Sequence, residues 1–341
     1  MIDSQPSLAG RPRLPVGLAA YGFGYLCGFA GYGTARACPD PYDAYRLMDL
    51  AVSHGLGGVE FPLDWGLPGL TRTDLEQARA YADARDLFIV VDGGVVDVDE
   101  LRTLLPTAAV LGAGVVRVVA SGILCGDRRA VRETWPAYLA EIADRLRAMR
   151  GLAEETGVAI ALENHQDVTS AELLELCTSL DSPCIGVTLD AINPLAVVED
   201  PLAFARRVAP FIKNVHLKDY RVYNTPEGYR LARCAVGAGV LDVVGLCAVL
   251  AREAPRAPVS IELGALQARH VRFLDDDFWP GYPPRRAEEI LPVLRLRDEH
   301  GRAAGEAWRT PWEHDASAEE LAAFELSEIE ESVAFLRRMM G

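Results

Sequence analysis

The sequence predicts an α/β protein: a (β/α)8 barrel of the TIM type with a C-terminal extension. Eight short apolar, β-branched runs recur along the chain, and stretches with helical spacing separate them. The runs are almost continuously hydrophobic, which is typical of strands buried on both faces of a parallel sheet. The glycine-rich stretch YGFGYLCGFAGYG from Tyr21 lacks the GxGxxG and GK[ST] phosphate fingerprints. We therefore prefer the barrel to an open nucleotide-binding sheet and interpret this stretch as a flexible loop over the barrel mouth.

The element order follows from these runs. The eight expected strands begin at Val16, Gly57, Leu87, Val115, Val158, Cys184, Phe211 and Val259. The expected helices cover residues 42–54, 74–85, 99–111, 130–155, 170–180, 201–208 and 242–253. Thr73 and Ser170 are expected N-caps, and Gly55, Gly112 and Gly157 follow expected helix ends. The barrel therefore takes residues 1–264.

Residues 265–341 form the extension, which we assign to the same domain. The segment DDDFWPGYPPRR from Asp275 predicts an ordered irregular structure, and residues 317–339 have the caps and spacing of a closing helix. Two interpretations remain open. The extension is either a final barrel helix with decoration, or a lid or subunit interface.

Composition excludes some classes of partner. Half of the residues are hydrophobic, so a full core is expected. The net charge of −15, from 49 acidic and 34 basic residues, works against binding to nucleic acid or anionic membranes. The seven cysteines (27, 38, 125, 177, 184, 234 and 247) form no CxxC pair, and no run approaches the length of a membrane span. We expect a cytoplasmic protein with reduced thiols.

Four consecutive expected strands end in residue types that bind metals: Glu163, Asp190, His216 and Glu262. In such a barrel the C-terminal ends of the strands line the mouth, where chemistry takes place. Three carboxylates around one small volume repel each other unless a cation offsets them. The imidazole completes a mixed oxygen and nitrogen set that suits Mn²⁺, Mg²⁺, Co²⁺ or Zn²⁺. We expect one divalent ion here, with Mn²⁺ as the first choice.

Four short motifs carry a resemblance to a known family: LENH at 162–165, TLDAIN at 188–193, NVHLKD at 214–219 and SIEL at 260–263. In this order they resemble the xylose-isomerase-like barrel superfamily, which includes sugar-phosphate isomerases, ketose 3-epimerases and AP endonuclease four. The resemblance covers residues 15–264. It implies that the same four strand-end residues hold the ion, and that Glu163 and Glu262 also move protons on opposite faces of a sugar.

The chain departs from that pattern in two places. Asn193 stands where ketose epimerases and the DNA-repair relatives often have a histidine, so we expect it to contact substrate through its amide. The repair enzymes use further histidines to hold three zinc ions, whereas here the third strand ends in Asp92 and the fourth in Ala120 and Ser121. A trinuclear phosphodiesterase site is therefore not expected, in keeping with the acidic charge.

Two further polar residues at strand ends have two interpretations each. Glu60 could bond a substrate hydroxyl, or it could pair with a barrel arginine such as Arg117. Lys218 lies two residues after the expected histidine ligand and could hold an oxyanion or phosphate of the substrate. Its alternative is a structural ion pair with Asp219 or a neighbouring glutamate.

His165 and Trp65 are the last candidate site residues. Two positions after Glu163, His165 could face the same cavity and serve as a base that the metal does not hold, or it could be hydrogen-bonded to Asp167. Trp65 could form part of a sugar-binding platform or simply pack in its loop.

Two enzyme functions and one non-enzymatic role compete. The first is a metal-dependent isomerase or epimerase that acts on a sugar or 3-oxo-sugar by proton transfer next to a carbonyl, through an enediolate. The second, by resemblance to the large subunit of bacterial C-glycoside deglycosidases, is a lyase that eliminates the aglycone of a 3-oxo C-glycoside together with a small β subunit. A homo-oligomer, or a hetero-oligomer docked around Trp279 and Tyr282, is expected. The intact ligand set argues against a scaffold protein that has lost its chemistry.

Overall fold

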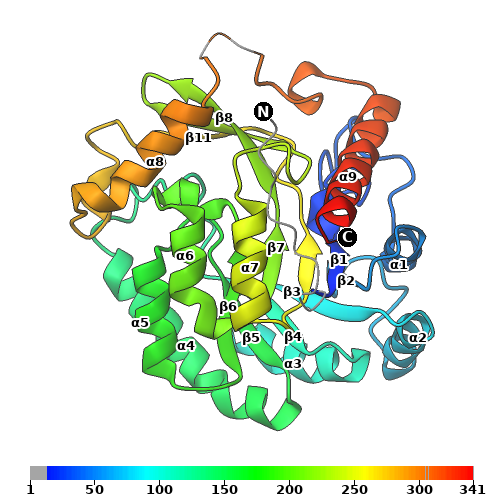
Figure 1. Ribbon diagram of the computed structural model, residues 1–341. Helices are drawn as coiled ribbons and strands as arrows, with labels where there is room; N and C mark the ends of the chain where they lie inside the picture. The colour runs from blue at the N-terminus through cyan, green and yellow to red at the C-terminus, as the bar shows by residue number, and fades with distance from the viewer. Residues whose placement is uncertain (1–13, 304, 306, 341) are drawn as a thin grey trace.

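The computed structural model describes residues 14–303, 305 and 307–340, and it contains the predicted barrel (Figure 1). Eight parallel strands close in the order β1-β10-β7-β6-β5-β4-β3-β2. The barrel strands are β1 (Val16–Ala19), β2 (Gly58–Pro62), β3 (Phe88–Val95), β4 (Val115–Val119), β5 (Ala159–Glu163), β6 (Ile185–Asp190), β7 (Ile212–Leu217) and β10 (Val259–Ile261). The fold class predicted from the sequence is therefore confirmed.

The helices alternate with these strands, as predicted. They are α1 (Ala44–Ser53), α2 (Arg72–Asp83), α3 (Val98–Leu111), α4 (Trp135–Thr156), α5 (Ser170–Leu180), α6 (Pro201–Val208) and α7 (Val243–Glu253). The N-caps expected at Thr73 and Ser170 are wrong, because Thr71 and Thr169 cap α2 and α5 with reciprocal capping boxes. The helix end expected at Gly157 is confirmed, with φ of 69°.

The strand register places the polar strand ends within two residues of one another along neighbouring strands. Asp190 at the end of β6 lies opposite His216 on β7, and His216 lies opposite Ser260 on β10. On the other side of β6, Thr188 lies opposite Glu163, the last residue of β5. All residues of β6 are buried, because the barrel interior and the outer helices cover its two faces.

A second sheet was not predicted from the sequence. It consists of β8 (Asp219–Thr225), β9 (Gly228–Cys234) and β11 (Arg269–Val271), in the order β11-β9-β8 with antiparallel pairing. Its first strand starts two residues after β7 ends, so the sheet grows out of the C-terminal end of the barrel. In Figure 1, β8 and β11 lie at the end of the molecule where α8 (Ala287–His300) is drawn.

The extension contains two long helices, of which one was predicted. The closing helix expected over 317–339 is present as α9 (Ala318–Met340), whereas α8 was missed. The segment before α8, expected to be irregular, contains only one short 3-10 helix, η4 (Trp279–Gly281). The other 3-10 helices are η1 (Ala20–Phe23), η2 (Asn193–Val197), η3 (Ala209–Phe211) and η5 (Trp312–His314).

Buried polar contacts attach α9 to the mouth of the barrel. The carboxylate of Glu325 accepts hydrogen bonds from the backbone N–H groups of Tyr25 and Leu26, both at 2.9 Å. Arg233 on β9 lies between Glu325 (3.7 Å) and Glu328 (2.8 Å). The glycine-rich loop, expected to be flexible, is therefore held against α9.

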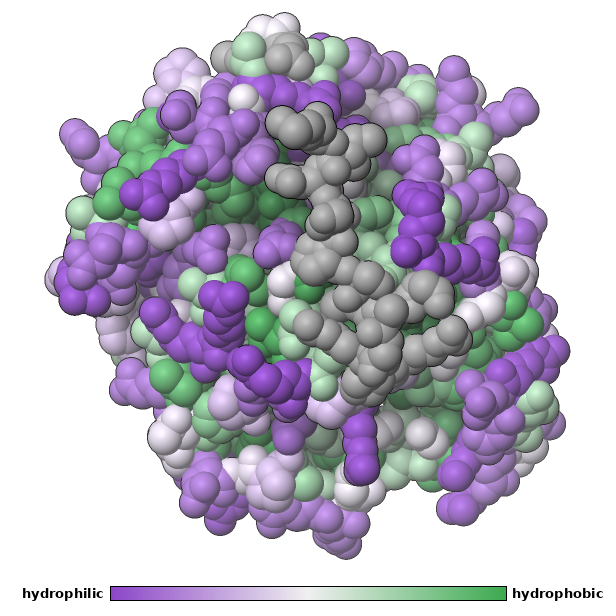
Figure 2. Space-filling view, in the orientation of Figure 1, coloured by the Kyte–Doolittle hydropathy of each residue, from purple (hydrophilic) through white to green (hydrophobic). Residues whose placement is uncertain are grey.

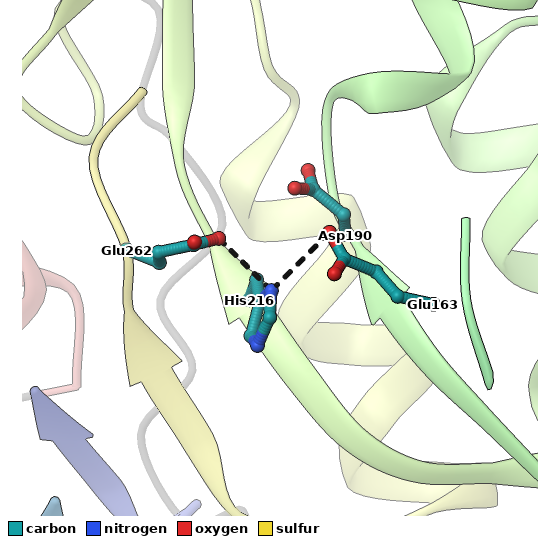
Figure 3. A group of neighbouring side chains, drawn as sticks. All are labelled: Glu163, Asp190, His216 and Glu262. Carbon is teal, nitrogen blue, oxygen red and sulfur yellow. Dashed lines mark ion pairs between the residues drawn. The ribbon is translucent and has the colours of Figure 1, made fainter. Parts of the chain in front are cut away.

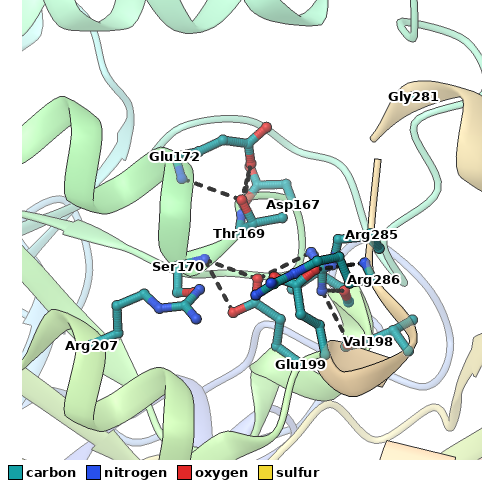
Figure 4. A network of polar contacts seen from close by, with 12 residues as sticks. Asp167, Thr169, Ser170, Glu172, Val198, Glu199, Arg207, Gly281, Arg285 and Arg286 are labelled. Atoms are coloured by element: carbon teal, nitrogen blue, oxygen red, sulfur yellow. Dashed lines mark hydrogen bonds and ion pairs between the residues drawn. The ribbon is translucent and has the colours of Figure 1, made fainter. Parts of the chain in front are cut away.

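A second set of contacts holds the loops that follow β5 and β6 (Figure 4). Glu199 accepts from the backbone N–H of Ser170 (3.3 Å) and pairs with Arg285 (3.2 Å), which comes from the segment before α8. Arg128 binds Glu172 through two nitrogens at 2.6 and 2.9 Å. Both loops leave strand ends that carry candidate ligands, so these contacts fix the surroundings of the site.

The molecular surface is mixed in character. On the face that Figure 2 shows, hydrophilic side chains are interspersed with apolar ones. No helix in the described part of the chain is both long enough and apolar enough to span a membrane.

Candidate metal centre

The four strand-end residues expected to bind a metal lie together at the barrel mouth. Glu163, Asp190, His216 and Glu262 each offer one ligand atom, and these atoms all lie within 4.8 Å of one another. All four side chains are buried. Figure 3 shows that Glu163 and Glu262 approach the imidazole from opposite sides, because they come from strands on either side of β7.

The two imidazole nitrogens of His216 have different partners. Its Nδ1 lies 2.9 Å from Glu262 Oε2 and 3.6 Å from Glu163 Oε1. Its Nε2 lies 2.7 Å from Glu60 Oε1, which also accepts from Asn214 Nδ2 at 2.9 Å. Glu60 can therefore accept the Nε2–H proton and leave the Nδ1 lone pair directed at the cluster.

Arg117, in the middle of β4, extends into the cluster of carboxylates. Its Nη2 lies 2.5 Å from Glu163 Oε2, and its Nε lies 3.7 Å from Asp92 Oδ1. The pair suggested between Glu60 and Arg117 is wrong, because these two carboxylates take the guanidinium instead. Burial alone would raise the pKa of Glu163, but Arg117 and His216 lower it well below its usual range.

Lys218 lies between two of the candidate ligands. Its Nζ is 2.6 Å from Asp190 Oδ2 and 3.0 Å from Glu262 Oε2. The alternative pairing with Asp219 is wrong, because that carboxylate accepts four backbone N–H groups. The pairing with a neighbouring glutamate is correct.

Asn193 and Asn164 both hold Asp190 in place. Asn193 Nδ2 donates to Asp190 Oδ2 at 2.7 Å, and its own Oδ1 is buried without a hydrogen bond. Asn164 donates to the backbone carbonyl of Asp190 (2.9 Å) and accepts from its N–H (2.8 Å). The amide of Asn193 thus serves a ligand residue, and its carbonyl oxygen is free for another donor.

His165 has no contact with Asp167, so that alternative is wrong. Asp167 accepts from Ser121 Oγ at 2.6 Å, while Nδ1 of His165 is buried without a hydrogen bond. Burial lowers the pKa of His165, and the neighbouring Glu163 opposes this effect. The imidazole is therefore neutral near pH 7 and able to accept a proton.

Trp65 belongs to a group of aromatic side chains beside the mouth. Its indole N–H donates to the carbonyl of Cys27 at 2.8 Å, and its ring packs 5.6 Å from Phe29 and 6.3 Å from Phe61. Phe29 in turn lies 4.8 Å from Tyr21. Trp65 is thus fixed by packing, and Tyr21, about a third exposed, is the ring of this group nearest Arg117 (5.6 Å).

Acidic side chains outnumber basic ones in the centre, and protons offset part of the difference. Two permanent cations, Arg117 and Lys218, face five buried carboxylates: Glu60, Asp92, Glu163, Asp190 and Glu262. Burial raises the pKa of Asp190 to about 7, against the charge of Lys218. Burial alone would lower the pKa of His216, but Glu262 and Glu60 raise it well above its usual value. The metal-free site therefore holds protons on His216 and partly on Asp190, which a divalent ion could replace.

The donor atoms fit a divalent metal ion. Both carboxylate oxygens of Glu163, Oε2 of Glu262 and Nδ1 of His216 are buried and make no hydrogen bond in the described part of the chain. Ion pairs with Arg117, Lys218 and His216 satisfy these atoms in part, and a bound ion would complete their coordination. Carboxylates and one imidazole are donors that Mn²⁺, Mg²⁺, Co²⁺ and Zn²⁺ accept. Binding would displace a proton from His216, so metal affinity should fall in acid.

Two residues of the site, Arg117 and Asp92, were not predicted as site residues from the sequence. Arg117 was considered only as a partner for Glu60, and Asp92 only as a strand end. The signal for Arg117 was its position, because a charged residue in the middle of the run VVRVV must have a buried partner. Asn214, which hydrogen-bonds Glu60, gave a weaker signal of the same kind.

Comparisons with known proteins agree with the fold. A family model described as xylose isomerase-like TIM barrel matches residues 48–276. The chain is 27% identical over 262 residues to an uncharacterized protein, YihM, of Escherichia coli strain K12, with 74% of this chain and 78% of that protein covered. It is 23% identical over 233 residues to a 3-oxo-isoapionate decarboxylase of Pectobacterium atrosepticum, with 67% and 78% covered.

A solved structure shows the same fold. The crystal structure of 3-keto-D-glucoside 4-epimerase, YcjR, from E. coli superposes with a TM-score of 0.54 at 15% identity. The superposition covers 84% of this chain and all of that one.

Proposed function

The chain belongs to the xylose isomerase-like TIM barrel family, and on this premise we propose that it is a divalent-metal-dependent enzyme that isomerises or epimerises a sugar or 3-oxo-sugar by proton transfer next to a carbonyl. The observation that carries the proposal is the position of Glu163 and Glu262 on either side of His216 Nδ1. Two carboxylates that face one substrate position from opposite sides can remove and return a proton on opposite faces of a carbon.

The ion would be held by Glu163, Asp190, His216 and Glu262. When bound, it supplies a Lewis acid that polarises the substrate carbonyl and stabilises the enediolate. Lys218 and Asn193 hold Asp190 in place, and Glu60 orients the imidazole.

The two glutamates are ionised and are therefore bases in the resting state. Arg117 stabilises the carboxylate of Glu163, while His216 and Lys218 lower the pKa of Glu262 to about 2 against the effect of burial. His165 is a third candidate, because its imidazole is neutral and its Nδ1 has no partner. In an isomerisation, the glutamate that accepted the proton can return it to the neighbouring carbon on the same face. In an epimerisation, the opposite glutamate must first take a proton from solvent before it donates one.

A lyase of the C-glycoside deglycosidase type is the second candidate. It is favoured by the relative whose name denotes decarboxylation of a 3-oxo acid, because that reaction also breaks a carbon–carbon bond near a carbonyl. The same bases would remove the proton beside the carbonyl of a 3-oxo C-glycoside, and the aglycone would leave. A small β subunit would be the partner.

Deuterium exchange separates the two candidates. The Mn²⁺-loaded protein is incubated with free ketoses in deuterated water, and the products are read by NMR. An isomerase or epimerase places deuterium on the carbon next to the carbonyl. The lyase instead releases an aromatic aglycone from a 3-oxo C-glycoside, which absorbance detects. A protein that remains fully active after its metal has been chelated would contradict both.

The control for either reaction is Glu262→Gln. We expect this variant to fold normally and to lose turnover by about 10²- to 10⁴-fold, as removal of a general base does. Near-normal activity would refute the role of Glu262.

A further inference from the structure

The sheet of β8, β9 and β11, called the roof sheet below, covers the C-terminal end of the barrel. The hydroxyl of Tyr229 on β9 donates to the carbonyl of Leu195, in the loop after β6, at 2.5 Å. Arg233 on the same strand donates to the carbonyl of Gly22, in the loop after β1, at 3.1 Å. One face of the roof sheet therefore lies against loops from separate parts of the mouth.

Arg269 on β11 is directed to that same face. In an antiparallel sheet, directly opposed residues and alternate residues share a face. Arg269 lies opposite Leu231, which is two residues from both Tyr229 and Arg233. Tyr220 on β8, buried at the mouth, lies opposite Arg233 and so shares the face as well. Arg269 thus looks toward the barrel from the edge of the roof sheet.

Arg269 has no anionic partner. Across the described residues it makes no hydrogen bond or ion pair through its side chain, and its Nε is buried without an acceptor. The buried arginines of the same region each contact a carboxylate: Arg117, Arg128, Arg233 and Arg285. The Nε–H of Arg269 lacks an acceptor, and the terminal nitrogens, which are not buried, remain available to a ligand.

The position of the guanidinium is near the mouth. Burial raises the pKa of Tyr220 to about 12, and the positive charges of Lys218 and Arg269 oppose this rise. Burial also raises the pKa of the Cys125 thiol, in the loop after β4, and Arg269 opposes that effect too. Arg269 therefore lies close enough to influence ionisable groups both at the start of β8 and in the loop after β4.

We propose that Arg269 binds an anionic group of the substrate, a carboxylate or a phosphate, while the sugar end of the molecule reaches the metal centre. The guanidinium fork matches the two oxygens of either anion. The centre itself offers no such place, because Arg117 and Lys218 are already paired with its carboxylates. The inference rests on the proposed function, since it assigns the substrate class of that site as an acidic or phosphorylated sugar.

Three polyols of equal carbon length test the proposal by calorimetric titration: D-glucitol, D-gluconate and D-glucitol 6-phosphate. Each is titrated into the Mn²⁺-loaded full-length protein and into the same protein after chelation, because gluconate can also contact a metal ion. We expect at least one anion to bind about 10- to 100-fold more tightly than D-glucitol, with or without metal. The stronger of the two identifies the anion as carboxylate or phosphate.

Three variants locate the effect. Arg269→Met should abolish the preference for the anion, and Arg269→Lys, which keeps the charge without the fork, should retain part of it. Arg230→Met is the matched control, because Arg230 lies opposite His270 on the other face of the roof sheet and stacks on Trp308. It should keep the full preference.

Two results would overturn the inference: no preference for either anion in the wild-type protein, or a preference that survives Arg269→Met. Failure of the proposed function looks different. A protein that binds no Mn²⁺ but still selects anions through Arg269 would contradict the metal chemistry alone. A protein that binds Mn²⁺ without any such selection would contradict only the role of Arg269.

Discussion

Two of the buried arginine–glutamate pairs at the mouth of this barrel differ in how completely their polar atoms are satisfied. In the pair of Arg128 and Glu172, both carboxylate oxygens accept hydrogen bonds, from Arg128, from the Trp135 indole and from Thr169. The guanidinium also donates to backbone carbonyls at Asp167 and Gly281. This pair is complete.

The pair of Arg117 and Glu163 is incomplete. The two groups approach to 2.5 Å, yet neither oxygen of Glu163 makes a hydrogen bond within the described residues, and Nε of Arg117 also lacks one. Glu163 is more deeply buried than Glu172, whereas Arg117 is slightly more exposed than Arg128. We infer that the first pair stabilises the fold, while the second keeps oxygen atoms available for a ligand.

The largest expected effect on Mn²⁺ affinity comes from a substitution in the incomplete pair of Arg117 and Glu163. Glu163→Gln removes a charged donor atom from the cluster, so Mn²⁺ affinity should fall by about 100-fold or more, beyond the loss caused by mutating an outer partner. The free energy of unfolding without metal should also fall, because Arg117 loses a buried charged partner, so the loss of Mn²⁺ affinity is the result that distinguishes this variant. Calorimetric Mn²⁺ titration and urea unfolding measure the two quantities. Unchanged Mn²⁺ affinity would contradict the assignment.

A substitution in the complete pair of Arg128 and Glu172 should lower stability and leave Mn²⁺ affinity almost unchanged. Glu172→Gln leaves Arg128 buried beside a neutral partner, and breaking such a pair costs about 3–5 kcal/mol. The loss should appear in the free energy of unfolding, while Mn²⁺ affinity of the folded protein stays within about twofold of wild type. If Glu172→Gln weakened metal binding as strongly as Glu163→Gln, the distinction between the two pairs would fail.

A smaller effect is expected at Glu60, next to the incomplete pair. Glu60→Gln keeps the size of the side chain but weakens the hydrogen bond that it accepts from Nε2–H of His216. Mn²⁺ affinity should therefore drop by about 10- to 100-fold. Nitrogen-15 NMR of the metal-free protein, at a pH high enough to make His216 neutral, should show a mixture of tautomers where the wild-type protein has one. A single tautomer and full affinity in the variant would show that Glu60 does not orient His216.

An effect on stability alone is expected at Asp167, whose backbone carbonyl accepts hydrogen bonds from Arg128. Burial raises the pKa of the Asp167 carboxyl to about 7, against the Ser121 hydrogen bond, whereas an unfolded aspartate titrates near 4. The folded protein therefore retains a proton that the unfolded chain releases, and stability is lost as the pH rises from about 4 through about 7. Asp167→Asn should remove this dependence, which amounts to about 2–3 kcal/mol between pH 5 and pH 8. Urea unfolding at both pH values tests this, and equal pH dependence of the two proteins would contradict it.

The sequence was sufficient for the barrel and for the residues gathered at its mouth, because buried parallel strands leave a continuous apolar signal and the polar residues follow at fixed positions. It was insufficient where the signal depends on distant partners. Two strands of the roof sheet, DYRVYNT and GYRLARC, mix tyrosine and arginine with apolar residues, so they lack a continuous apolar signal. Helix α8 contains a proline, Pro292, which argues against a helix in the sequence. The partners of Glu60 and Lys218 depend on side chains from other strands, which spacing along one strand cannot rank.

Metal analysis of the purified protein tests the central claim most directly. Inductively coupled plasma mass spectrometry after dialysis against Mn²⁺ should find about one ion per chain, and the melting temperature should fall when the ion is chelated. Glu163→Gln should hold far less metal under the same conditions, while Glu172→Gln should hold as much as wild type. A protein that retains no divalent ion, and whose melting temperature responds neither to Mn²⁺ nor to a chelator, would contradict the account.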